Sequence, residues 1–270
     1  MNLYIPDTLT AGNSEKYTMS IRLWPGGLSF AGWIPSEKDS FFYGETVADR
    51  KRRYDYLIQD LFFAHPFLSY SYRQIVVITA NRQFTSVPES IFVEKLKEQL
   101  MSFVFSSPDE KVLYERLDEF ESVVLYTMQP QVYEFLSRSL LHPTFTHAIT
   151  PMLNQWKRHN LTGFPKQLYG ALYDDMIYIS CLDKGTLLFL NSFHIEDVSD
   201  MIYYILYVWK LTGLDQLNDE LFLYANPHQY MTLKETLQNY LSHIEFIQPQ
   251  RLHTGLDVPP DITALFQCGL

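Results

Sequence analysis

QLYGALYDDMIYISCLDKGTLLFLNSFHI, which spans residues 167–195, contains three apolar runs separated by two short polar turns. The turns fall at residues 174–175 and 183–185 and contain Asp and Gly, which tolerate the backbone dihedral angles of tight turns. Apolar runs of this length between turn residues are typical of strands. The stretch therefore predicts a three-stranded antiparallel meander. Its strands are residues 167–173, 176–182 and 186–195.

The segments after the meander alternate between helix and strand. Residues 197–211 carry apolar side chains at helical spacing, which predicts a helix with one buried face. The apolar run ELFLYA, at residues 220–225, predicts a strand. We expect a further helix at residues 231–241, a short strand at residues 244–247 and an irregular tail from Leu252.

The N-terminal part of the chain repeats this order of elements. The turn PGG, at residues 25–27, separates two predicted strands, a third strand follows at residues 40–47, and a helix follows Asp49. The sequence ITAN at residues 78–81 matches LYAN at residues 223–226, and both end a predicted strand. Matched elements keep a nearly constant spacing along the chain. Each half reads β-β-β-α-β-α, which predicts an internal duplication.

The middle of the chain predicts a helix, a strand pair and two more helices. Pro88 is well placed for the first turn of a helix. Residues 111–117 and 121–128 are the predicted strand pair, and residues 130–141 and 144–159 are the two helices. The apolar stripe of the helix after Pro88 consists of Ile91, Phe92, Leu96, Leu100 and Phe103.

A duplicated unit of this form resembles the actin-like ATPase, or ribonuclease-H-like, fold. The whole chain is similar to a small uncharacterised bacterial family with that fold, and more distantly to actin-like proteins of type IV pilus assembly and type II secretion. The resemblance implies an α/β fold of two β-β-β-α-β-α lobes with mixed sheets. It divides the chain into a lead-in segment (1–16), a first lobe (17–128), connecting helices (129–165), a second lobe (166–248) and a C-terminal tail (249–270).

The same resemblance implies where a nucleotide would bind. In active members of this fold, ATP lies between the lobes, and a turn in each lobe carries Asp and Gly residues that hold phosphate and metal. The first turn here has Gly26 and Gly27 but no carboxylate. The second turn has Asp174 and Asp175 but no glycine, whose small size would let the backbone approach phosphate. Asn226 stands at the adenosine position without a glycine pair.

These departures from the family pattern imply a non-catalytic interaction or scaffold protein that needs no cofactor. The alternative is an ATP- and Mg²⁺-binding protein or weak ATPase. Asp174 and Asp175 offer carboxylate oxygens, which Mg²⁺ prefers, but Asp is equally common in two-residue hairpin turns. Gly26 and Gly27 are likewise either a hairpin turn or a phosphate cradle. The sequence shows no metal-ligand spacing, P-loop or nucleophile elbow, so it predicts no metal site and no catalytic residue.

One basic cluster stands out, at the beginning of the first predicted helix. Cations are disfavoured at a helix N-terminus, so the cluster hints at an anionic ligand or an acidic partner. The alternative is a solvated helix face with acidic neighbours such as Asp55. The aromatic runs at residues 41–43 and 203–204 mark either interface surface or internal packing. The basic cluster consists of Arg50, Lys51, Arg52 and Arg53.

Composition narrows the class of protein. Apolar residues make up 47% and charged residues 19% of the chain, which is enough to bury a core. The net charge of −10 counts against nucleic acid as a partner, because phosphate affinity is mostly electrostatic. Two cysteines, Cys181 and Cys268, fit a reducing compartment. Neither a signal peptide nor a bilayer-spanning run is visible. We therefore expect a cytoplasmic protein, without membrane insertion, whose partner is another protein.

Overall fold

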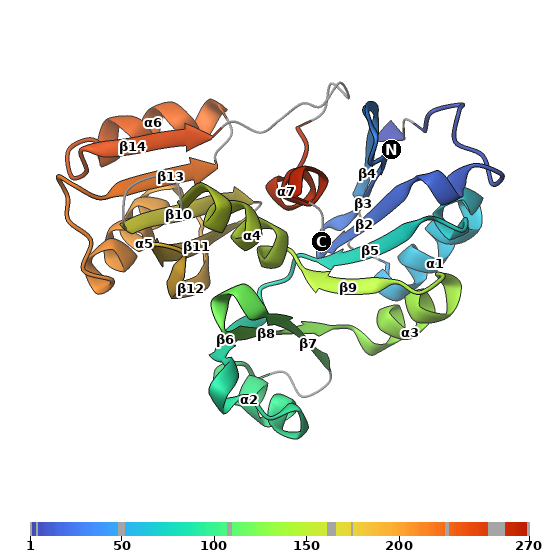
Figure 1. The fold of residues 1–270 in the computed structure, drawn as a ribbon, viewed down its shortest axis with the longest axis horizontal. Helices are drawn as coiled ribbons and strands as arrows, with labels where there is room; N and C mark the ends of the chain where they lie inside the picture. The colour runs from blue at the N-terminus through green and yellow to red at the C-terminus, as the bar shows by residue number, and fades with distance from the viewer. Residues whose placement is uncertain are drawn as a thin grey trace. The chain divides into compact units, whose positions relative to one another are not determined.

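The chain forms two compact units, each assembled from separate stretches of sequence (Figure 1). Unit 1 comprises Met1–Arg116, Val123–Ala148 and Arg251–Val258, and unit 2 comprises Leu117–Ser122, Ile149–Gln250 and Pro259–Leu270. The chain therefore passes between the units repeatedly. The computed structural model describes residues 2–3, 5–47, 52–106, 110–160, 166–173, 175–224, 227–247 and 257–268.

Unit 1 is built on a mixed sheet with the strand order β1-β4-β3-β2-β5-β9. β2, β3 and β4 form an antiparallel meander, and β5 and β9 extend it with parallel pairs. Met19, Ile21 and Leu23 of β2 point into one core, because alternate residues of a strand share a face. The strands are β1 (Asn2–Leu3), β2 (Thr18–Trp24), β3 (Gly27–Ile34), β4 (Glu37–Val47), β5 (Gln74–Thr79) and β9 (Thr144–His147).

Two helices cover this core from one side of the sheet. α1 (Tyr54–Ala64) and α3 (Pro130–Ser139) lie against each other, as Figure 1 shows. Ile58 of α1 and Leu136 of α3 are completely buried there. The opposite face of β2 carries Ser20 and Arg22, which are also buried. On that face the two polar side chains lie among buried apolar neighbours of the adjacent strands, such as Val76 and Ile78 of β5.

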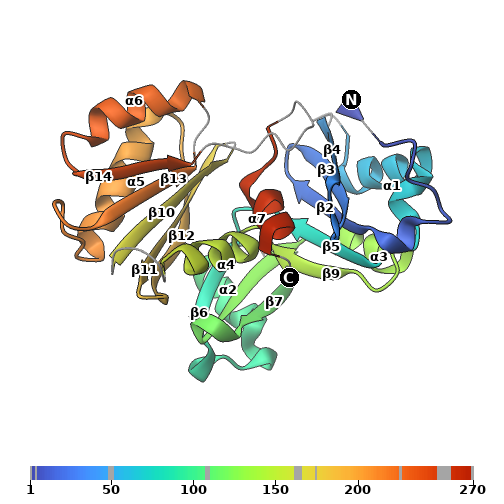
Figure 2. The ribbon, with the colours of Figure 1, turned by 45° about the horizontal axis from the view of Figure 1, so that its top comes forward.

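Unit 2 is built on a second mixed sheet with the order β12-β11-β10-β13-β14. α5 and α6 pack on one face, and α4 packs on the other, where Trp156 stacks on Tyr169 with ring centroids 5.4 Å apart (Figure 2). α7 packs on α4. The strands are β10 (Lys166–Tyr173), β11 (Met176–Asp183), β12 (Thr186–His194), β13 (Glu220–Tyr224) and β14 (His243–Ile247); the helices are α4 (Ile149–Asn160), α5 (Val198–Leu211), α6 (Pro227–Leu237) and α7 (Pro260–Cys268).

The two sheets share one arrangement of strands. In each, an antiparallel meander is extended at its first strand by a parallel strand: β5 beside β2, and β13 beside β10. The predicted α/β fold of two mixed-sheet lobes is confirmed. The predicted meander at residues 167–195 is present as β10, β11 and β12, and its second turn has Lys184 and Gly185 in the left-handed region, with φ of 49° and 83°.

A third sheet, which the sequence did not predict in full, lies in unit 1. Its order is β6-β8-β7, and the helix predicted from Pro88 is wrong. Pro88 instead ends β6 with an extended backbone, φ −54° and ψ 134°. Proline lacks an N–H donor, so it is tolerated at the end of an edge strand such as β6, where no ladder hydrogen bond is lost. A shorter helix follows after two 3₁₀ turns. The elements are β6 (Phe84–Pro88), β7 (Lys111–Leu117), β8 (Ser122–Met128) and α2 (Lys97–Val104).

Two other predicted elements need correction. The helix predicted at residues 144–159 begins only at Ile149, because residues 144–147 form β9 and pair with β5. The tail predicted as irregular contains α7, in which Pro260 occupies the first helical position, where proline is favourable. Within the lead-in segment, β1 pairs with β4. Every helix within the described residues is too short or too polar to span a bilayer. The five-part division of the chain stays a prediction.

Candidate functional site

Trp24 lies over the turn that contains the two predicted phosphate-binding glycines. A Cβ atom built on Gly26 would lie 2.6 Å from the indole Nε1 of Trp24. A Cβ atom on Gly27 would lie 2.2 Å from the carbonyl oxygen of Thr46 and 2.9 Å from Cζ2 of Trp24. Both positions therefore need glycine so that Trp24 and β4 can pack against the turn. This structural role requires no ligand.

A small pocket lies beside this turn, at the carboxyl ends of β2 and β5. Its volume is about 190 Å³, and Trp24, Tyr54 and Asn81 are among the residues that line it. The Tyr54 hydroxyl donates a hydrogen bond to the Gly27 carbonyl at 2.8 Å, and burial raises the pKa of Tyr54, so the hydroxyl remains a donor at neutral pH. Pockets for drug-sized ligands usually hold roughly 300–1,000 Å³. This pocket fits a phosphate-sized group better than a whole nucleotide.

A buried cation lies under the pocket. Arg22 is only 1% exposed, and its guanidinium carbon is 5.4 Å from the centroid of the Trp24 ring. Burial, followed by the positive charge of Arg22, lowers the pKa of His147 to about 3, although a bond to the Asn81 carbonyl works in the opposite direction. The Nε2 of His147 lies 3.2 Å from that carbonyl. His147 is therefore a neutral core residue near the buried guanidinium of Arg22.

A hydrogen-bonded network joins the ends of β5 and β8. The Asn81 amide donates to the Thr127 carbonyl at 2.5 Å, and its oxygen accepts from the Gln83 N–H at 3.1 Å. The Thr127 hydroxyl donates to the Gln83 side chain at 3.0 Å. Asn81 lines the pocket beside the turn, whereas Gln83 and Thr127 line a second and larger cavity. Glu110 lines both cavities. The network thus lies where the two cavities adjoin.

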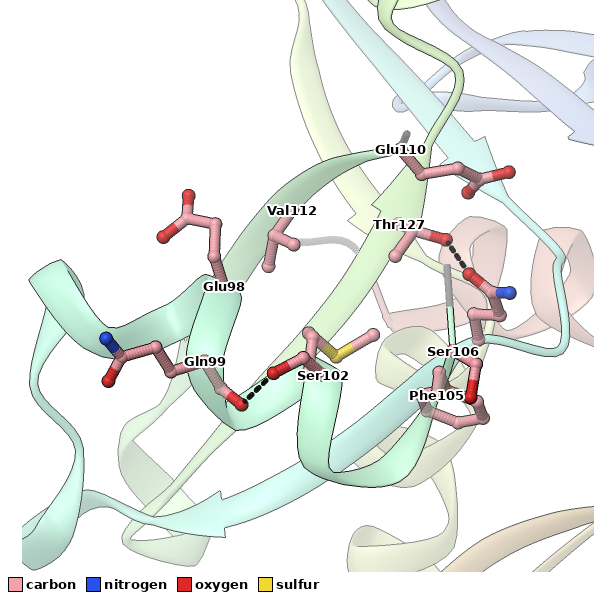
Figure 3. A pocket seen from close by; sticks show the side chains of 10 residues that line it. Glu98, Gln99, Ser102, Phe105, Ser106, Glu110, Val112 and Thr127 are labelled. Carbon is pink, nitrogen blue, oxygen red and sulfur yellow. Dashed lines mark hydrogen bonds between the residues drawn. The ribbon is translucent and has the colours of Figure 1, made fainter. Parts of the chain in front are cut away.

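The larger cavity is a groove of about 410 Å³ between α2 and the third sheet (Figure 3). Its floor contains the apolar side chains of Met101, Phe105 and Val112, and Glu98 and Glu110 add two carboxylates. The segment around the groove leaves large apolar side chains in solvent. Their exposed fractions are 62% for Ile91, 50% for Val93, 43% for Leu96, 90% for Phe103 and 56% for Val104.

The turn between β10 and β11 is fixed by hydrogen bonds to the backbone carbonyl of Asp175. The Ile195 N–H donates to the Asp175 carbonyl at 2.8 Å, and the Nδ1 of His194 lies 3.0 Å from the same oxygen. The Asp175 carboxylate is 52% exposed and lies 3.6 Å from His194 Nδ1. Asp175 therefore joins the turn to the end of β12. Asp174 and Asn226, the other predicted ligands here, lie outside the described residues.

Arg52 and Arg53, the two residues of the basic cluster that the structure describes, pair with acidic side chains of α1. Arg52 forms an ion pair with Asp60 at 3.0 Å, and Arg53 donates two hydrogen bonds to Asp55, at 2.8 and 3.2 Å. Arg50 and Lys51 lie outside the described residues. Elsewhere in the described ranges, no three His, Cys, Asp or Glu side chains are grouped to hold a metal ion. Burial raises the pKa of the Cys181 thiol to about 11, which suits a core residue.

Sequence reasoning missed most of the residues that shape these cavities. Trp24 and Arg22 read as ordinary strand residues, and only the fold places them beside the Gly26–Gly27 turn. The sequence pattern places Phe103 on the apolar stripe of a longer helix, but its side chain is almost fully exposed. The sequence did contain one useful signal. Residues 91–104 hold more apolar side chains than the short helix in this segment can bury.

Comparisons with known proteins agree on the fold. A protein of unknown function from Bacteroides thetaiotaomicron VPI-5482, with an actin-like ATPase fold, is 28% identical, with a TM-score of 0.86; the match covers 97% of this chain and 99% of that chain. The PilM–PilN type IV pilus biogenesis complex contains a chain that is 8% identical, with a TM-score of 0.51, over 85% of this chain and 88% of that one. No curated protein matches significantly.

The predicted resemblance to an uncharacterised family with the actin-like ATPase fold is confirmed. The model of a family described as a protein of unknown function matches residues 6–244, which include the third sheet and all of both mixed sheets except β1 and most of β14. We conclude that this chain has the actin-like ATPase fold and belongs to that family, DUF3822.

Proposed function

We propose that this chain is a non-catalytic interaction protein that binds a partner protein through α2 and the groove beside it. The observation that carries the proposal is the exposure of Phe103, whose side chain is 90% accessible to solvent on a short helix. Ile91, Val93, Leu96 and Val104 are further exposed apolar side chains in the same segment of the chain. Contiguous exposed apolar residues mark interaction sites in soluble proteins.

The chemistry of the groove favours one class of partner segment. An apolar floor suits an apolar side chain, and the carboxylates of Glu98 and Glu110 suit Lys or Arg beside it. We therefore propose a segment of a partner protein in which apolar residues alternate with basic ones. In keeping with this proposal, a protein with the same fold is part of the PilM–PilN complex. The proposal includes a cytoplasmic location and an origin of the two lobes by internal duplication.

Affinity capture with the full chain tests this proposal when it compares two matched variants. Phe103→Ser removes an exposed ring from α2, and Phe63→Ser removes a 79% exposed ring from α1. We expect the native chain and Phe63→Ser to retain a protein that Phe103→Ser loses, and we expect that protein to dissociate as ionic strength rises. A set of bound proteins that Phe103→Ser leaves unchanged would contradict the proposal.

A second candidate function is binding of ATP and Mg²⁺, in which the small pocket beside Trp24 would take one phosphate group of the nucleotide. The pocket is phosphate-sized, and the buried guanidinium of Arg22 lies near its wall, 5.4 Å from the Trp24 ring. Calorimetric titration with ATP and Mg²⁺ tests this function, followed also by the tryptophan fluorescence of the native chain and of Trp24→Phe, since Trp24 is one of four tryptophans. Neither heat nor a fluorescence change at millimolar nucleotide would remove it. If binding occurs, Asp174→Ala and Asp175→Ala report whether the second turn takes part.

A further inference from the structure

β12 forms an outer edge of the sheet in unit 2. Within the described residues it pairs with β11 on one side only. The corresponding strand of unit 1 is β4, whose outer edge is covered by β1 through the register pairs Asn2–Glu45 and Leu3–Gly44. Because the two sheets share one strand order, the edge of β12 is the position at which unit 1 has an additional antiparallel strand.

The β12 edge has few of the features that normally prevent strand pairing. Exposed edge strands usually carry charged residues or proline, or they are very short. β12 runs over Thr186–His194, and its first eight residues, TLLFLNSF, include no charge and no proline. Its one register irregularity lies beside Leu188, since Cys181 pairs with Phe189 and Leu182 with Leu187. Residues 189–194 therefore form a regular edge that can accept a strand.

An aromatic surface continues from this edge onto α5. Phe193 stacks on Tyr204 with ring centroids 4.3 Å apart and an interplanar angle of 13°. Tyr204 contacts Tyr203, which stacks on Tyr207 at 6.0 Å. Tyr203 is 61% exposed and Tyr207 is 46% exposed. The aromatic pair at residues 203–204 thus reaches the surface, whereas Phe41, Phe42 and Tyr43 are buried.

We propose that β12 pairs with β12 of a second copy of this chain, antiparallel and about a two-fold axis at Asn191. In this register Phe189 lies opposite Phe193 of the second copy, and Asn191 lies opposite its own counterpart. Cross-strand aromatic pairs stabilise antiparallel sheets, and like charges placed opposite each other destabilise them. A strand without charge near the axis is therefore suited to pairing with itself, and it needs no complementary partner sequence.

The hydrogen bonds of the edge fit the same register. The Ser192 N–H donates to its neighbour, the Asn191 side chain, at 2.9 Å. Residues of a strand alternate in the side to which their N–H and C=O groups point, so Leu190 and Ser192 share one side. On pairing, the Ser192 N–H donates to the Leu190 carbonyl of the second copy instead of to the Asn191 side chain. The released Asn191 amide then bonds to its counterpart across the axis.

This proposal goes beyond the proposed function. The two predict opposite effects of salt concentration on binding. Each copy carries a net charge of −10, so two copies repel each other at long range, and added salt should strengthen self-association. Binding of a basic segment to Glu98 and Glu110 should instead weaken with salt. Failure of one proposal therefore leaves the other to be judged by its own experiment.

Sedimentation equilibrium of the full chain is the test, and Asn191→Lys is the main variant. We expect a dimer for the native chain and a monomer for Asn191→Lys, since two ammonium groups would face each other at the axis. Leu217→Lys, at an exposed leucine away from β12, should remain a dimer. Circular dichroism and thermal unfolding establish that each variant is folded. A native chain that is monomeric at high concentration and high salt would overturn the proposal.

A crosslink checks the register itself. Facing residues of a non-hydrogen-bonded antiparallel pair have Cα atoms about 4.5 Å apart, within the range of a disulfide. In a Cys268→Ser background, Asn191→Cys should therefore form a covalent dimer on mild oxidation. Leu188→Cys, which lies away from the axis, should not. Equal crosslinking of both variants, or of neither, would overturn the two-fold register.

Discussion

Gly27 and Thr46 approach so closely that a Cβ atom on Gly27 would lie 2.2 Å from the Thr46 carbonyl oxygen. The obstacle is backbone, which cannot rotate away, and the Trp24 ring closes the other side at 2.9 Å. We expect Gly27→Ala to lower the free energy of unfolding by about 1–3 kcal/mol, the usual cost of overpacking. Chemical denaturation of the purified chain measures this change.

A matched glycine provides the control. A Cβ on Gly12 would have the Thr10 hydroxyl oxygen as its nearest neighbour, at 3.9 Å, which is ordinary van der Waals contact. Gly12→Ala should therefore alter stability by no more than about 0.5 kcal/mol. If Gly27→Ala were as mild, the close packing of Trp24 and β4 on this turn would be incorrect.

Acid should destabilise unit 1 through His147. Its folded pKa is lowered to about 3 by burial, whereas the unfolded chain titrates near the ordinary value of 6.5. Between these values the unfolded state binds more protons, so stability is full above pH 6.5 and falls as the pH drops toward 3. The slope should approach 1.36 kcal/mol per pH unit for this one group. Denaturant unfolding at several pH values measures the slope.

Two variants isolate the contribution of His147. His147→Phe keeps a ring to stack on Phe84, at present 4.4 Å away, and removes the titrating group. This variant should lose stability overall but show a shallower pH slope. His142→Asn replaces an exposed histidine at positive φ with a residue that tolerates that backbone and should keep the native slope. An unchanged slope in His147→Phe would assign the acid sensitivity to other groups.

The two thiols should differ in reactivity. Cys181 is completely buried, and burial raises its pKa to about 11, so almost no thiolate forms at neutral pH. Titration of the native chain with a thiol-specific reagent should therefore modify Cys268 alone, and denaturant should release the second thiol. The Cys268→Ser variant should show no rapid reaction when folded. Fast labelling of that variant would mean that the β11 core opens readily.

Local signals account for the elements that sequence reasoning predicted well. The meander at residues 167–195 needed only apolar runs and short polar turns, and the left-handed backbone of Lys184 and Gly185 is what a tight turn requires. The helix from Val198 to Leu211 was equally clear, and Asp197 caps it by accepting from the Ser199 N–H at 2.7 Å. Such information lies within a few residues of each element.

Long-range contacts decide the rest. β9 is only four residues long and is a strand because it pairs with β5, which lies far away in the sequence. The candidate sites depend on similar contacts. The alternating pattern of β2 would equally place Arg22 on a solvent-exposed face, but in the structure Arg22 is buried and lies near the Trp24 ring. The exposure of Phe103 is likewise invisible in the sequence, whose pattern places this residue on the apolar stripe of a longer helix, whereas in α2 only Met101 is buried.

The division of each unit among separate stretches of sequence has a practical consequence for protein engineering. Unit 2 includes the tip of the β7–β8 hairpin, and unit 1 includes residues near Val258 that follow nearly all of unit 2 along the chain. A cut at any single peptide bond would leave at least one unit without part of its structure. We therefore expect the lobes to fail when expressed as separate fragments, and to unfold together when the intact chain is heated.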